Sequence, residues 1–172
     1  NGDGDGSKED PTNLQALFGL NPVNKIGPQE TAPNENLTKN GDIIILLGNK
    51  GDFLISENSS LQLKPRQKLL SPGGYLRLYS ESDNERYIDF EPQGKTATLK
   101  FENENNTKLP LDTQETFEIH HMVKLDENNA ISGINFDGSY SFAIGNNVTG
   151  IYGNNLSGDI NITNNKFKHL TK

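Results

Sequence analysis

The chain lacks cysteine and tryptophan altogether, and its basic residues are outnumbered by acidic ones. Without cysteine, disulfide bridges, thiol catalysis and zinc-thiolate sites are excluded. Among 172 residues, 16 Lys and Arg stand against 23 Asp and Glu, which gives a formal net charge of −7. Because nucleic-acid and anionic-membrane binding need clustered positive charge, we expect neither partner.

Apolar residues are also few. Hydrophobic types make up 31% of the chain, and no apolar run approaches the roughly 20 residues of a membrane-spanning helix. We therefore expect no membrane span and a lean core. Sheets with one polar face suit this composition, because alternate residues of a strand can face solvent.

The composition changes near residue 40. Residues 1–40 are rich in Gly, Asp, Asn, Pro and Glu, and carry one apolar island with room for a single helical turn. We interpret this segment as a flexible acidic arm or linker; the alternative is an extended N-terminal arm that docks through Leu17, Phe18 and Leu20. Residues 41–172 form the expected folded domain.

The folded domain is predicted to be all-β. Short apolar or alternating runs are separated by Gly, Asn, Asp and Pro at regular spacing, and Gly48–Gly51 and Asp137–Gly138 predict hairpin turns. Ile43–Leu47 is apolar throughout, so we expect this strand to be covered on both faces. About ten short strands predict an antiparallel sandwich or a jelly-roll-like barrel.

A short pattern, Gly-Asn-Asn-x-Ser/Thr-Gly, occurs at 145–150 and again at 153–158. Three ways to explain it are a repeat architecture, a pair of turns and a pair of glycan sites. Two copies of so short a unit are too few for a solenoid, which needs at least three stacked repeats. Because Asn and Gly tolerate the left-handed backbone of tight turns, we interpret each Gly-Asn-Asn as a turn, with short strands from Val148 to Tyr152 and from Leu156 to Ile162.

Six Asn-x-Ser/Thr sequons are a mild excess over what chance gives in an Asn-rich chain. The acceptor residues are Asn36, Asn58, Asn105, Asn147, Asn155 and Asn161. If the chain passes through a glycosylating secretory pathway, we expect Asn147 and Asn155, in the predicted turns, to be modified first.

The first ten residues place side-chain oxygens at alternate positions with glycine at the sixth, as a calcium-binding loop does. The candidate metal ligands are Asn1, Asp3, Asp5, Ser7 and Glu9. Thr12 stands where such a loop requires a bidentate Glu. We therefore expect weak Ca²⁺ binding at most, with a solvated acidic linker as the alternative. No other cofactor is expected.

The sequence contains no set of catalytic residues that would indicate a particular reaction. The three histidines have no metal-type spacing, and there is no Gly-x-Ser-x-Gly elbow and no glycine-rich phosphate loop before a helix. Carboxylates such as Asp89 and Glu91 could serve glycosidase chemistry, but solvent-facing acids are expected throughout an acidic protein. We predict a protein that is not an enzyme.

Residues 75–91 predict a hairpin with two distinct faces. A three-residue loop at 82–84 lays Leu78 opposite Ile88, whereas a two-residue loop would lay Leu78 opposite Asp89. The first register separates apolar from polar side chains, and burial of one face fixes a register. We therefore predict the three-residue loop, with the apolar face packed against the core.

The other face of this hairpin is the candidate binding surface. Its predicted binding residues are Tyr75, Arg77, Tyr79, Tyr87 and Asp89. Tyrosine offers a large contact area and a hydroxyl at little cost in conformational entropy, so it is frequent in recognition surfaces. The alternative is a polar outer face whose cross-strand pairs only stabilise the sheet.

Together these features predict a secreted or surface-exposed module for adhesion, or for binding a protein or glycan partner or further copies of itself. The alternative is a structural subunit of a virion, fibre or surface filament, in which residues 1–40 clasp a neighbour. In either case we expect the protein outside the cell, on the cell surface or on a virion surface.

Overall fold

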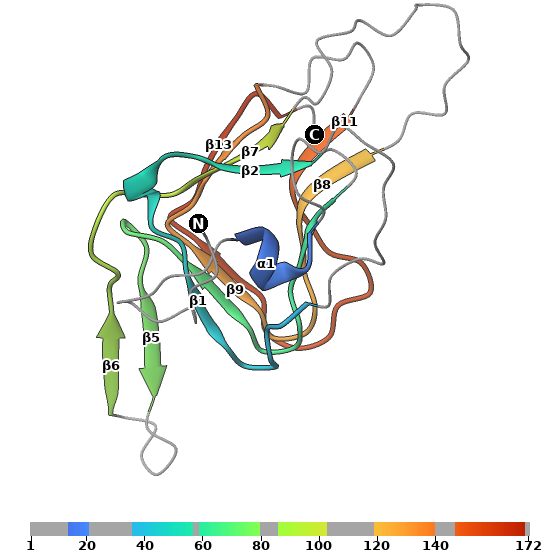
Figure 1. Cartoon of the computed structure of the whole chain (residues 1–172). Coiled ribbons are helices and arrows are strands. Elements are labelled where there is room, and N and C mark those ends of the chain that lie inside the picture. Colours follow the sequence, from blue (N-terminus) through green and yellow to red (C-terminus); the bar gives the residue numbers. More distant parts are fainter. Residues whose placement is uncertain are drawn as a thin grey trace, which may run out of the picture.

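The computed structural model describes residues 14–20, 36–56, 59–79, 86–102, 119–139 and 147–170. Within these ranges the chain winds into four successive coils of short strands (Figure 1). The first coil holds β1 (Ile43–Ile45), β2 (Phe53–Ser56) and β3 (Leu61–Gln62). The second holds β4 (Lys68–Leu70), β7 (Thr98–Glu102) and β8 (Ile119–Lys124). The third holds β9 (Ala130–Ser132), β10 (Asn135–Asp137) and β11 (Asn147–Tyr152).

The fourth coil contributes two strands, β12 (Asn161–Thr163) and β13 (Lys166–Lys168). Outside the coils, β5 (Leu76–Tyr79) and β6 (Tyr87–Phe90) form an antiparallel hairpin between β4 and β7. The helical elements are α1 (Leu14–Phe18) and a 3-10 turn, η1 (Gly48–Lys50).

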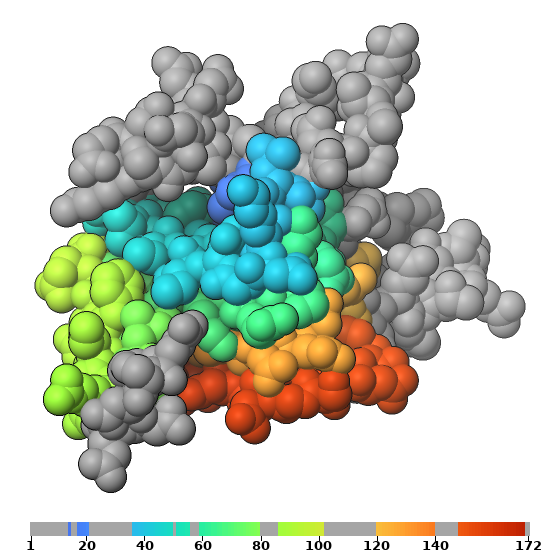
Figure 2. All heavy atoms as spheres, turned by 90° about the horizontal axis from the view of Figure 1, so that it is seen from below, coloured from blue at the N-terminus to red at the C-terminus, as the bar shows by residue number. Residues whose placement is uncertain are grey.

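Equivalent strands of successive coils stack into three parallel sheets, in the orders β1-β4-β9-β12, β2-β7-β10-β13 and β3-β8-β11. Along the first sheet, Ile44, Leu69, Ile131 and Ile162 are successive partners. Figure 2 shows the coils as layers that follow one another from the N-terminal to the C-terminal end. This is the architecture of a parallel β-helix, in which each coil buries its apolar side chains against its neighbours.

The predicted antiparallel sandwich or jelly-roll barrel is therefore wrong. Alternation of apolar and polar residues looks the same in a parallel coil as in an antiparallel sheet, so the pattern gives the strands but not their partners. The hairpins expected at Gly48–Gly51 and Asp137–Gly138 are wrong as well. β1 pairs with β4 rather than β2, and β10, which ends at Asp137, lies between β7 and β13.

Rejecting a solenoid was a further error, because the repeating unit is a whole coil rather than eight residues. Asn161 of β12 pairs with Ala130 of β9, which lies 31 positions earlier. Of the two Gly-Asn-Asn copies, the first lies outside the described ranges at residues 145 and 146, and β11 covers the strand predicted from Val148 to Tyr152. The second leads from β11 towards β12, with Asn155 in the left-handed region at φ 51°, as turn chemistry predicts. The strand predicted from Leu156 to Ile162 is wrong for most of its length, because β12 begins at Asn161.

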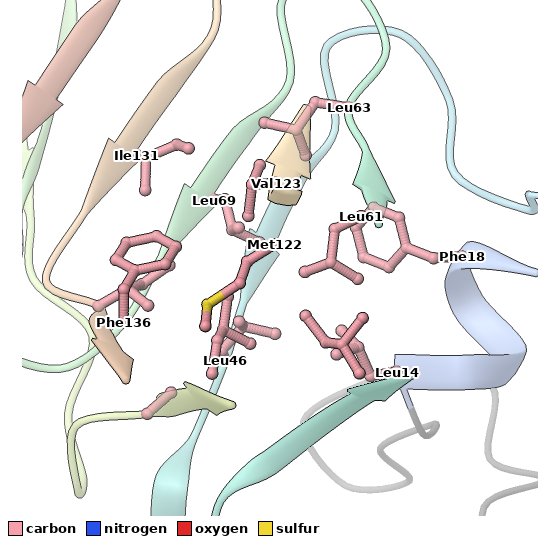
Figure 3. Close-up of a cluster of buried hydrophobic side chains, with 14 of the residues drawn as sticks. Leu14, Phe18, Leu46, Leu61, Leu63, Leu69, Met122, Val123, Ile131 and Phe136 are labelled. Carbon is pink, nitrogen blue, oxygen red and sulfur yellow. The ribbon is translucent and has the colours of Figure 1, made fainter. Parts of the chain in front are cut away.

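Apolar side chains fill the interior of the coils (Figure 3). The largest fully buried side chains of this core are Ile55, Leu61, Leu63, Leu69, Leu99, Phe101, Met122, Ile131, Ile134 and Phe136. Burying one such side chain contributes about 1.5–3 kcal/mol relative to leaving it exposed. In β1, Ile44 is buried, but Ile43 is 43% and Ile45 41% exposed, so the expected cover on both faces of β1 is wrong.

Helix α1 lies over the first coil (Figures 1 and 2). Leu14 and Phe18 of α1, and Leu20 just beyond it, are buried in the same cluster as the first coil's core residues. Gly19, at φ 66°, takes the left-handed conformation that commonly ends a helix. Part of the predicted N-terminal arm thus packs on the core, whereas residues 1–13 and 21–35 lie outside the described ranges. A domain boundary near residue 40 stays a prediction.

Candidate functional site

The hairpin of β5 and β6 projects from the coils (Figure 1). We call this hairpin the arm; it is distinct from the N-terminal arm predicted for residues 1–40. At its base, Gly74 sits so close to the third coil that a Cβ there would clash with the backbone of Ser132. The backbone N–H of Tyr75 then donates to the Ser132 hydroxyl at 3.2 Å. Glycine therefore lets the chain leave the second coil here, and the hydrogen bond fixes the direction of departure.

The predicted register of the arm is confirmed. Its cross-strand partners are Leu76 with Phe90, Arg77 with Asp89, Leu78 with Ile88, and Tyr79 with Tyr87. The expectation that its apolar face packs on the core is wrong, because Leu78 is 40% and Ile88 72% exposed. The coils fill their own interior, so the arm stands outside it with both faces accessible beyond Leu76. Most of its loop, including 82–84, lies outside the described residues.

Four of the five predicted binding residues form one contiguous cluster on the arm. The Arg77 guanidinium donates to Asp89 through Nε–H to Oδ1 and Nη2–H to Oδ2, both at 2.8 Å. Its Cζ lies 3.9 Å from the centre of the Tyr87 ring, a cation–π arrangement. The Tyr79 ring meets the Tyr87 ring edge to face, with centroids 6.1 Å apart. The fifth residue, Tyr75, lies exposed at the base of the arm.

The ion pair makes this cluster electrically neutral without removing its polar groups. Hydrogen bonding from Arg77 lowers the pKa of the Asp89 carboxyl, and the same bond raises the pKa of the Arg77 guanidinium. Both side chains stay charged over the physiological pH range. Each is about two-fifths exposed, so solvent screens the pair and its contribution to folding stability is small.

The other sequence-derived sites give less. Residues 1–9, the candidate calcium ligands, lie outside the described ranges, and among the described residues no three His, Asp or Glu side chains gather as a metal ion would need. His121 stacks on Tyr152 with ring centroids 4.0 Å apart, and burial lowers its pKa. In the part of the chain that the structure describes, no helix has the length and apolar character to cross a membrane.

The sequence reading missed an apolar groove at the C-terminal end of the coils. The groove has a volume of about 600 Å³ and is lined by residues such as Ile151, Ile162, Phe167 and Leu170. It exists because the described part of the fourth coil supplies strands to two sheets and none over β11. The alternation in Lys166-Phe167-Lys168 was the available signal, but it does not say which strand is the last.

The outward side chains beside this groove form a ladder of alternating charge. Lys100, Asp137 and Lys168 are successive partners across β7, β10 and β13. Asp137 also bonds the His169 ring at 2.9 Å. Partial burial alone would raise the pKa of Asp137, but hydrogen bonds from His169 and Ser139 outweigh it and lower that pKa. The carboxylate is therefore held charged between two lysines.

No protein-family model, curated protein or solved structure matches this chain. A function for the arm must therefore be inferred from its geometry and chemistry.

Proposed function

We propose that this protein is a non-enzymatic, secreted or surface-exposed binding module, in which the parallel coils present the arm to a protein or glycan partner. One observation carries the proposal: Arg77, Tyr79, Tyr87 and Asp89 are ordered against one another on an exposed arm. They take no part in the buried core.

The order of this cluster favours binding, because side chains that are already held in place lose little conformational entropy when a partner binds. An immobilised side chain costs an interface about 0.5–1.5 kcal/mol in conformational entropy. Arg77 is already held by two hydrogen bonds and a ring face, and Tyr87 by two neighbours. Tyr and Arg are also the types that carry most binding energy where interfaces have been scanned with alanine.

The competing explanation is that these contacts serve only to hold the hairpin together. An isolated two-stranded hairpin is marginally stable in water, and cross-strand pairs contribute roughly 0.2–1 kcal/mol each. That explanation leaves no reason for both faces of the arm to be exposed, with Ile88 and Tyr79 open to solvent on opposite sides. A partner that covers the arm would supply one.

A structural subunit that clasps its neighbour through residues 1–40 is supported less well. Leu14 and Phe18 of that segment are buried in the core of their own chain. They are therefore not free to bind another one.

The test is a glycan array together with light scattering, applied to the wild-type chain, to Tyr79→Ala and to a control, Tyr152→Ala. Both tyrosines are exposed, Tyr79 by 58% and Tyr152 by 38%, but Tyr152 lies on β11, away from the arm. We expect glycan binding or self-association that Tyr79→Ala weakens by more than about tenfold and the control leaves unchanged. Binding that both variants leave intact, or no binding of either kind, would contradict the proposal.

A further inference from the structure

Among the strands that the structure describes, β13 and β6 each stand at the edge of their sheet. β13 is the last strand in the order β2-β7-β10-β13, and β6 has β5 as its one neighbour in the hairpin. In Figure 1, β6 is the outer strand of the arm, with β5 on the side of the coils. An open edge presents unpaired N–H and C=O groups, which another strand can pair with.

The edge of β13 is basic on one face and aromatic on the other. Its sequence is Lys166-Phe167-Lys168, and both lysines are exposed. Phe167 stacks on Phe136 with ring centroids 5.0 Å apart and is still 50% exposed towards the end of the coils. On the β10 side of β13, Asp137 is the partner of Lys168. A strand that paired with the other edge of β13 would continue the alternation of charge if it placed an acidic residue opposite Lys168.

The edge strand β6 has the complementary chemistry at the same spacing. It ends in Asp89-Phe90, and Glu91 follows directly. Because side chains alternate along an extended strand, the two carboxylates lie on one face and Phe90 on the other. Phe90 and Glu91 are exposed. The pattern acid-Phe-acid thus matches Lys-Phe-Lys in spacing, in charge and in aromatic position.

We propose that β6 of one copy adds to the open edge of β13 of a second copy. Phe90 then packs against Phe167 at the apolar groove, and the carboxylates of Asp89 and Glu91 lie beside Lys166 and Lys168. This inference rests on the proposed function, because it names a second copy of the chain as the partner of the arm. Asp89 keeps its bond to Arg77, so Glu91 supplies the carboxylate for the new ion pair.

The two surfaces of this contact are different, so each copy offers one arm and one β13 edge. Such a head-to-tail contact does not stop at two copies; it closes into a ring or grows into a filament, depending on the rotation between neighbours. The helix α1 lies over the first coil, at the opposite end of the coils from β13 (Figure 2).

The test measures self-association by sedimentation velocity for the wild-type chain and for two charge variants. The first is Lys166→Glu with Lys168→Glu; its control, Lys39→Glu with Lys95→Glu, has the same net charge and reverses exposed lysines elsewhere. We expect the wild-type chain to associate, the first variant to lose at least about tenfold in affinity through like-charge contact, and the control to stay close to wild type. Because all four lysines are exposed, both variants should stay folded, with a somewhat lower melting temperature for the first, in which Lys168→Glu puts a like charge beside Asp137.

The second variant, Glu91→Lys, provides a complementation test. It should self-associate as poorly as the Lys166→Glu, Lys168→Glu chain, because its arm now meets lysines. Mixed together, the two variants should associate again, because each arm then meets a β13 edge of opposite charge.

Three results would overturn the inference: a wild-type chain that stays monomeric up to about 1 mM, a control as weak as the edge variant, or a mixture that does not associate. If the wild-type chain is monomeric but binds a glycan through Tyr79, the proposed function stands and this inference falls. If neither self-association nor a Tyr79-dependent ligand is found, both fall.

Discussion

Replacing leucine by alanine at Leu69 and at Leu78 compares how much a coil residue and an arm residue contribute to the unfolding free energy. Leu69 is fully buried in β4, between Ile44 and Ile131 of the neighbouring coils. Leu69→Ala leaves a cavity that rigid coils above and below cannot fill, so we expect a loss of about 2–5 kcal/mol in unfolding free energy. Leu78 lies on the arm and is 40% exposed. Its truncation removes part of a transfer term of about 1.5–3 kcal/mol and opens no cavity, so we expect about 1 kcal/mol or less.

Urea unfolding of the wild type and both variants, followed by circular dichroism, provides the comparison. The slopes should agree between the three chains, because a change in slope would mean that the extent of unfolding had changed. Equal losses at Leu69 and Leu78 would refute the reasoning, because they would mean that the apolar face of the arm is buried after all.

Three further perturbations have definite expected outcomes. Gly133→Ala should lower the unfolding free energy, followed by thermal melting, by well over 2 kcal/mol, because at φ 80° a Cβ would also clash with the backbone of Gly74. Its control, Gly41→Ala, has a similar φ of 82° but open space around it, so we expect a loss of roughly 1–2 kcal/mol. Asp137→Asn should lower the unfolding free energy at neutral pH. Because the pKa of this carboxyl is lowered in the folded chain, the difference in unfolding free energy between wild type and variant should shrink below about pH 4, which urea titrations at pH 7 and pH 3 can show. In a glycosylating host, peptide mapping should find Asn155, exposed in its turn, modified before Asn36, whose side-chain amide donates to Gln62.

Local structure could be read from the sequence, and the arm is the clearest case. Its register follows from residues within a 17-residue stretch, because Leu78 must face Ile88 if apolar and polar side chains are to separate. The cluster around Arg77 follows from that register. What the pattern could not give is the environment: segregation of the two faces indicates burial of one, yet both are exposed on this arm.

The coils could not be read in the same way, because their strands pair with segments far along the chain. Ile43 pairs with Lys68, 25 positions away, while Lys68 pairs with Ala130, 62 positions away. The arm and long connections interrupt the second coil, so no constant period runs through the sequence. The 31-residue period shows only late, where Ala130-Ile131-Ser132 aligns with Asn161-Ile162-Thr163. A similarity over three residues, with one of them identical, is hard to distinguish from chance in the sequence alone.

The groove and the open edge of β13 were out of reach for the same reason. Lys166-Phe167-Lys168 has the pattern of a short alternating strand, which occurs in any β fold. Only its place as the last strand of a parallel sheet turns it into an edge with a defined complement.

The central claim is that the arm binds partners while the coils fold without it. The most direct measurement is the association of a chain in which residues 77–91 are replaced by a short Gly-Ser turn, alongside its thermal melt. Leu76 and the coil residues remain in this variant, so we predict cooperative melting within a few degrees of wild type and complete loss of association. Association that survives the replacement, or coils that no longer melt cooperatively, would contradict the claim.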